Sequence, residues 1–116
     1  MLVQSSARPS AQAGFLPISP EQMRAHVGEA TALLKALANE DRLMLLCRMI
    51  GRRLNVGELA ELTGIQQPTL SQQLGVLRHE GLVSVEREGR YMYYQLSNPD
   101  VMRVMQALWE VYCAPR

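Results

Sequence analysis

The sequence has little of what marks a secreted, membrane-bound or catalytic protein. No run of apolar residues approaches the roughly 18 that a membrane-spanning helix needs. The first residues are rich in Ser, Ala and Gln and lack the basic and then apolar order of a signal peptide. No Ser/His/Asp arrangement or phosphate-binding glycine loop stands out, and 116 residues leave little room for a substrate cavity. We therefore expect a cytoplasmic protein that is not an enzyme.

Charge and metal ligands are equally sparse. The formal net charge is only +1, so any affinity for nucleic acid would depend on where the charges lie. The two histidines, His26 and His79, have no partners at metal-ligand spacing, and we expect no metal ion or other cofactor. The only cysteines, Cys47 and Cys113, are far apart in the sequence. In a cytosolic chain two such thiols do not by themselves indicate a structural disulfide.

The apolar pattern predicts one small, mainly helical domain behind a polar arm. Residues 1–18 carry Ser, Gln, Ala and proline without an apolar stripe, and we interpret them as a flexible N-terminal arm. The predicted domain covers residues 19–116. Ser19 caps its first helix, and apolar spacing with further caps predicts helices over 40–50, 56–63, 68–79 and 100–113.

Between the last two of these helices the apolar period changes. Residues 82–87 and 90–96 are β-branched and aromatic runs around Glu88 and Gly89, which predicts a β-hairpin. The resulting order of elements is that of a winged helix-turn-helix with one helix added at each end. The predicted fold is therefore mainly α with a β-hairpin wing, centred on residues 56–96.

The second helix of the predicted helix-turn-helix carries an unusual surface. Its apolar residues fall on one side, and the opposite side has hydroxyls and amides with almost no charge. An ordinary surface helix would carry Lys and Glu, whereas Gln and Thr can read base edges in the major groove. Two arginines at the hairpin tip suit contact with phosphate or the minor groove. The predicted DNA-binding residues are Gln67, Thr69, Ser71, Gln72, Gln73, Arg87 and Arg90.

Charges near the predicted wing are mixed. Glu86 and Glu88 oppose DNA binding by like charge, so the contribution of the wing should be modest. Arg52 and Arg53, just before the helix-turn-helix, could also reach phosphate. The alternative for these segments is a solvated helix face and a solvated turn without a ligand.

These motifs resemble those of the ArsR family of bacterial winged-helix repressors. The resemblance extends over residues 37–96 and is carried by the runs LANEDRL (37–43), VGEL (56–59) and QPTLSQQLGVLR (67–78). It implies a homodimer that binds an inverted-repeat operator in double-stranded DNA, with the N- and C-terminal helices forming the dimer interface. The last helix supports dimerisation independently, because its apolar residues span roughly 200°, about twice what one buried face needs.

The thiols distinguish this chain within the family. Members that sense arsenite or lead carry Cys-x-Cys in the first helix of the helix-turn-helix, but this helix has no cysteine here. Zinc-sensing members place Asp and His ligands in the last helix, but this helix has no histidine here. Cys47 in the second helix and Cys113 at the end of the last are similar to the BigR-like subgroup. Those repressors respond to sulfide, persulfide or related oxidants through one cysteine in each of these helices. The resemblance implies that Cys47 and Cys113 are redox-sensing and that reactive sulfur species are the inducer.

Alternatives stay open for the thiols and for the function. Cys47 shares a predicted helix face with Leu43, Leu46 and Ile50, so by itself it is better explained as a packed core residue than as a sensor. The chain could be an ArsR-type repressor with a metal or other inducer and structural cysteines, or a winged-helix protein-interaction module. The function we predict is a DNA-binding transcriptional repressor that releases its operator when Cys47 and Cys113 are oxidised or bridged.

Overall fold

The computed structural model describes residues 17–115, and the chain divides after Ala30 into two compact units. Helix α1 (Pro20–Leu37) runs across this division. It begins as the sequence predicts, because the Ser19 hydroxyl accepts a hydrogen bond of 3.2 Å from the Gln22 amide. The arm predicted over residues 1–18 lies almost wholly outside the described residues and stays a prediction.

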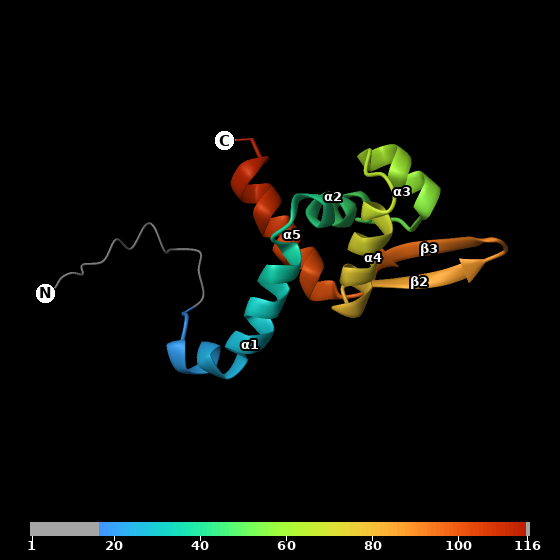
Figure 1. Ribbon diagram of the computed structural model, residues 1–116. Coiled ribbons are helices and arrows are strands. Elements are labelled where there is room, and N and C mark those ends of the chain that lie inside the picture. Colours follow the sequence, from blue (N-terminus) through green and yellow to red (C-terminus); the bar gives the residue numbers. More distant parts are fainter. Residues whose placement is uncertain (1–16, 116) are drawn as a thin grey trace, which may run out of the picture. The chain divides into compact units, whose positions relative to one another are not determined.

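The second unit holds the end of α1 and the rest of the secondary structure (Figure 1). Its other elements are α2 (Glu40–Arg48), β1 (Leu54–Asn55), α3 (Val56–Thr63), α4 (Thr69–His79), β2 (Val83–Glu88), β3 (Tyr91–Leu96) and α5 (Pro99–Tyr112). This order confirms the winged helix-turn-helix predicted from the sequence. None of the helices in the described part of the chain is long and apolar enough to cross a membrane.

Asparagine caps begin three of the helices. The side chains of Asn39 and Asn98 accept hydrogen bonds from amides in the first turns of α2 and α5. Asn55 and Glu58 form a reciprocal capping box at α3, with two bonds of 2.9 Å. The end of α3 is set by Gly64, whose φ of 76° is a left-handed conformation that glycine adopts without strain. Local sequence therefore determines where the helix-turn-helix begins and turns.

The core lies where the apolar sides of α2, α3, α4 and α5 meet. Its fully buried side chains are Leu45, Leu46, Met49, Leu59, Leu70, Leu74, Leu77 and Val101. The prediction for α4 is confirmed, since its three leucines are all buried.

The face predicted for α2 is confirmed only in part, because Leu46 is fully buried and Leu43 and Ile50 pack against the core from its edge. Leu45 and Met49 are buried beside Leu46, whereas Leu43 and Ile50 are only partly buried and Cys47 is exposed. The segment Leu43–Cys47 is apolar on most sides of the helix, so its periodicity does not select one stripe. The contacts of α2 with α3 and α4 select it instead.

A third strand joins the predicted hairpin. The sheet order is β1-β3-β2, with Leu54 opposite Tyr94. The sequence did not predict β1, because two residues give no alternating pattern. Pairing of Glu88 with Tyr91 places Gly89 and Arg90 in the turn, one residue later than the sequence suggested. Gly89 has a φ of 64°, the positive value that short hairpin turns require.

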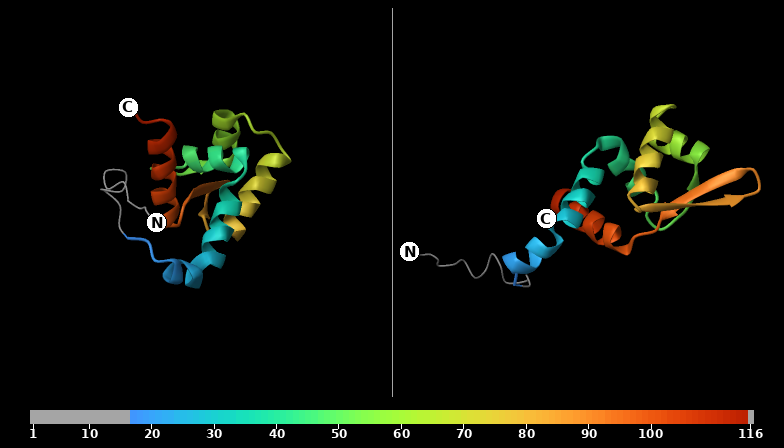
Figure 2. Two further views of the ribbon diagram at one scale, coloured as in Figure 1. Left: turned by 90° about the vertical axis from the view of Figure 1, so that its left-hand side faces the viewer. Right: turned by 60° about the horizontal axis from the view of Figure 1, so that its bottom comes forward.

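The two ends of the second unit carry different elements. Figures 1 and 2 place the tip of the β2–β3 hairpin at one end and α5 at the other, with α2 and α4 between them. The helix-turn-helix and the wing are therefore neighbours, and the last helix lies away from the hairpin tip.

We expect Asn55→Ala to lower the free energy of unfolding by about 1 kcal/mol, because the Glu58 amide loses its bond to the Asn55 side chain, while the bond from the Asn55 backbone amide to Glu58 can remain. Urea unfolding followed by circular dichroism, at one protein concentration, measures this change. Glu61→Ala on the exposed side of α3 is the matched control and should stay within about 0.5 kcal/mol of the parent. Equal destabilisation by the two variants would contradict the role of the cap.

Candidate DNA-reading helix, wing and thiol pair

Helix α4 has one buried side and one polar, accessible side. Leu70, Leu74 and Leu77 are at most 1% exposed and pack on the rest of the unit. Ser71 and Gln72 are exposed, and Thr69 is half-buried at the first turn. The structure thus presents hydroxyl and amide groups on a helix that follows a tight turn, which is the arrangement of a base-reading helix.

Gln67 caps the start of α4, a role that the sequence did not reveal. Its side-chain carbonyl accepts a hydrogen bond of 3.0 Å from the Ser71 amide, one of the first-turn donors of α4. Pro68 at the N-cap has no side chain that could do this. Gln67 is exposed, so its amide nitrogen stays at the surface while its oxygen holds the start of the helix.

Gln73 is only half-exposed and has a partner on another helix. Its Oε1 accepts a hydrogen bond of 2.8 Å from Nη1 of Arg42, near the start of α2. Sequence reasoning missed Arg42 altogether. The available signal was a glutamine directly beside the apolar stripe of α4, a position where a polar side chain needs a partner.

The arginines of the wing are both exposed, as predicted. Arg87 donates from Nε to the carbonyl of Gly89 across 3.1 Å, so it braces the turn that it precedes. Arg90 lies in the turn itself. The tip therefore carries two guanidinium groups, one of them tied to its own backbone.

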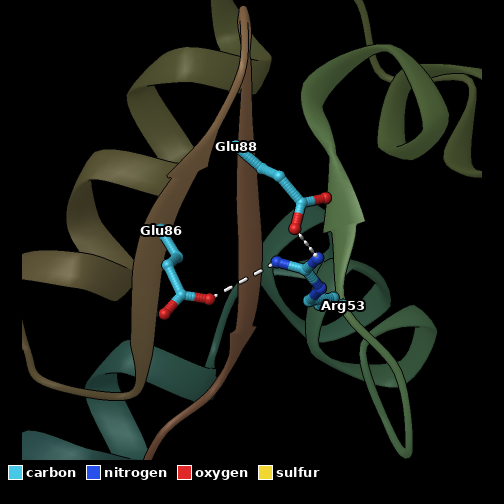
Figure 3. A network of polar contacts seen from close by, with 3 residues as sticks. All are labelled: Arg53, Glu86 and Glu88. Atoms are coloured by element: carbon cyan, nitrogen blue, oxygen red, sulfur yellow. Dashed lines mark hydrogen bonds and ion pairs between the residues drawn. The ribbon is translucent and has the colours of Figure 1, made fainter.

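Arg53 is directed at the wing rather than towards free solvent. Its Nη2 lies 2.8 Å from Glu88 and its Nη1 3.4 Å from Glu86 (Figure 3). The guanidinium also lies over the ring of Tyr93, 4.5 Å from its centroid. The hydrogen bond with Glu88 raises the pKa of Arg53. Glu86 and Glu88 thus share one counter-charge, and Arg53, which the sequence offered as a possible phosphate contact, is already paired with them.

Both cysteines are exposed free thiols. Cys47 lines a cavity of about 380 Å³ together with Ile50 and residues of α5, namely Met102, Met105, Gln106 and Trp109. The structure therefore does not support Cys47 as a packed core residue. Cys113 lies one turn beyond Trp109 on the same helix, because its amide donates to the Trp109 carbonyl at 2.7 Å.

Helix α5 is buried in its first half and exposes large apolar side chains towards its end. Val101 and Met105 pack into the core at 0% and 4% exposure. Trp109, Val111 and Tyr112 are 49%, 52% and 80% exposed. Such large apolar side chains in one helix are typical of a surface that meets a partner. Within residues 17–115, no three His, Cys, Asp or Glu side chains are grouped to hold a metal ion.

Comparison with known proteins agrees with this architecture. The profile of the family described as "Bacterial regulatory protein, arsR family" matches residues 39–85. The biofilm growth-associated repressor of Agrobacterium fabrum is 43% identical over 88% of this chain and 86% of its own length. The transcriptional activator HlyU of Vibrio cholerae is 38% identical over 84% of this chain and 90% of its own.

Solved structures give the same result. The crystal structure of the transcriptional repressor BigR from Xylella fastidiosa superposes with a TM-score of 0.80 at 40% identity. That superposition covers 84% of this chain and all of the BigR chain. Sequence identity at this level over most of both chains, with the same order of elements, shows common descent rather than a shared fold alone. This chain belongs to the ArsR family of bacterial regulatory proteins, and its relatives are transcriptional regulators.

Proposed function

We propose that this protein is a transcriptional repressor that binds an inverted-repeat operator as a homodimer and releases it when Cys47 and Cys113 are oxidised or bridged by reactive sulfur species. The observation that carries the DNA-binding part is the set of exposed hydroxyl and amide groups in the first turns of α4. The relative named as a repressor supports repression as the direction of regulation. Because another relative is named as an activator, a reporter gene placed behind the operator is the direct test of that direction.

In this proposal the exposed side chains of α4 contact the base edges. Ser71 and Gln72 are exposed, and Thr69 lies at the end of the helix that enters the groove first. A Gln amide can pair with adenine, and a Thr methyl can contact the methyl group of thymine. Arg87 and Arg90 at the wing tip supply positive charge for the phosphate backbone. Gln67 and Gln73 complete the proposed surface while also holding the helix in place.

Dimerisation supplies the second reading helix. Two half-sites of an operator lie about 34 Å apart, one turn of the duplex, so two copies of α4 must be held at that separation. The exposed apolar end of α5, with Trp109, Val111 and Tyr112, is the surface we assign to this contact. It lies at the other end of the unit from the wing tip, which leaves the reading side open to DNA.

The thiols act as the sensor in this proposal. Cys47 opens into an apolar cavity whose wall includes Trp109, and Cys113 follows Trp109 by one helical turn, a rise of about 5.4 Å. The two thiols are thus associated with the same stretch of α5. A direct disulfide needs Cα atoms about 4.4–6.8 Å apart, and a longer sulfur bridge relaxes this limit.

The chemistry requires both cysteines. The Cys47 thiolate attacks the outer sulfur of an organic persulfide, which becomes bound to Cys47 while the organic thiolate leaves. The Cys113 thiolate then attacks Sγ of Cys47 and displaces hydrogen sulfide, so the persulfide is reduced and the two cysteines are oxidised to a disulfide. If both cysteines first become persulfides, attack of one on the other releases hydrogen sulfide and leaves a three-sulfur bridge. Either bridge ties α2 to α5 and shifts the spacing of the two reading helices.

The DNA-binding proposal predicts that the reduced protein selects an inverted repeat from a random-sequence duplex library, with affinity that falls steeply with salt. Gln72→Ala should weaken binding to the selected duplex by about 1–3 kcal/mol and spare scrambled DNA. Arg90→Ala should weaken both and lower the salt slope by about one. Arg103→Ala on α5 is the matched arginine control and should leave the slope unchanged. A protein that selects no sequence would contradict the proposal.

The dimer proposal predicts that Tyr112→Asp converts the protein to a monomer, because a charge on an 80%-exposed interface residue must be desolvated on pairing. Light scattering after size-exclusion chromatography measures the mass. Glu110→Asp, a change without new charge on the same helix, is the control. A dimeric Tyr112→Asp variant would rule out this face as the interface.

The sensor proposal predicts that Cys47→Ser and Cys113→Ser bind the selected duplex like the reduced parent but no longer release it with glutathione persulfide. Mass spectrometry of the treated parent should show the loss of two hydrogens or an added sulfur between the cysteines. Each serine variant should carry at most a persulfide or mixed disulfide. Normal release by either variant would exclude a bridge between the two thiols.

A further inference from the structure

The guanidinium of Arg42 joins three helices. Its Nε donates to the Ala36 carbonyl at 2.6 Å and its Nη2 to the Lys35 carbonyl at 3.0 Å. These carbonyls belong to the last turn of α1, where backbone acceptors lack partners within the helix. Its Nη1 donates to Gln73 of α4 at 2.8 Å. Since Arg42 itself lies near the start of α2, one side chain connects α1, α2 and α4.

The chemistry of this contact fixes the orientation of the Gln73 amide. A guanidinium has only donors, so the atom of Gln73 that faces it must be the carbonyl oxygen. Adenine is read by an amide that both accepts and donates. In Gln73 the acceptor is already held by Arg42, whereas its neighbour Gln72 is exposed.

Burial alone leaves the rotation of α4 about its axis poorly defined. The three leucines of α4 secure its apolar face, but hydrophobic contact is non-directional. Gln73 lies at the flank of that apolar stripe, where a directional bond resists rotation most effectively. A hydrogen bond to a charged partner is among the stronger ones in proteins. Base reading tolerates displacements of only about 0.5 Å or 10–20°.

We infer that Arg42 is a positioning residue for sequence recognition: by holding the carbonyl of Gln73 it sets the rotation of α4, and Gln73 serves as an anchor rather than as a free base reader. The inference rests on the proposed function, since α4 must read DNA for its rotation to matter. Arg42 lies on the same nine-residue helix as Cys47, so the sensor helix itself holds the reading helix.

A double-mutant cycle tests this directly. The measured quantity is the specificity ratio, which is the affinity for the library-selected duplex divided by that for a scrambled duplex at one salt concentration. It is compared among the parent, Arg42→Met, Gln73→Met and the double variant. We expect each single variant to lower this ratio about tenfold and the double variant to lower it little further, because both changes break one contact. Affinity for the scrambled duplex should change much less.

Gln72→Met is the matched control, since it removes the same amide one residue earlier on the exposed side. Its effect should add to that of Arg42→Met, because the two side chains share no contact in our interpretation. Urea unfolding of all variants separates positioning from stability. If Arg42→Met does not fold, Arg42→Lys takes its place, because a lysine keeps the charge but not the three-way fork.

Three results would overturn the inference. Loss of specificity in Gln73→Met with none in Arg42→Met or Arg42→Lys would mean that Gln73 reads the bases itself. Additive losses would mean that the two residues act independently. Equal losses on selected and scrambled duplexes would mean a structural role only. A parent protein that binds no duplex would instead refute the proposed function, and the inference with it.

Discussion

The burial of three leucines of α4 against the rest of the second unit determines which side of this helix meets solvent. Leu70, Leu74 and Leu77 repeat at intervals of four and three and occupy the core, so the hydroxyl and amide groups of the same helix must lie outside. Any contact of α4 with DNA depends on this division. The leucines decide the face, and the polar contacts of Gln67 and Gln73 with the protein restrain the start and the rotation of the helix.

The wing shows how a chain of almost neutral net charge can offer a basic surface. Glu86 and Glu88 are paired with Arg53, which comes from the segment just before α3. Exposed ion pairs of this kind contribute little to stability. Their effect is to distribute charge: the acidic groups of β2 are compensated from within the protein, while Arg87 and Arg90 remain at the tip.

The second helix connects the two halves of the proposed switch. At its start Arg42 contacts the reading helix, and near its end Cys47 faces the cavity beside α5. The buried residues Leu45, Leu46 and Met49 lie between these positions along the helix and pack it into the core. A packed helix moves as a unit, since interiors at crystal-like density transmit displacement rather than absorb it. A bond between Cys47 and α5 would therefore act on the same body that holds α4.

Local signals in the sequence determined the elements and their order. These signals are the asparagine caps, the glycine with positive φ after α3 and the leucine spacing of α4. Each acts within a few residues of the chain, so the sequence alone predicts its effect. Only tertiary structure decided four other features. These are strand β1, the buried face of α2, the pairing of Arg53 with the wing, and the contact of Arg42 with Gln73. Each of them joins residues far apart in the chain or selects among several apolar faces, and no local propensity encodes such a choice. The exposure of Cys47 belongs to the same group, because it follows from how α2 is turned against its neighbours.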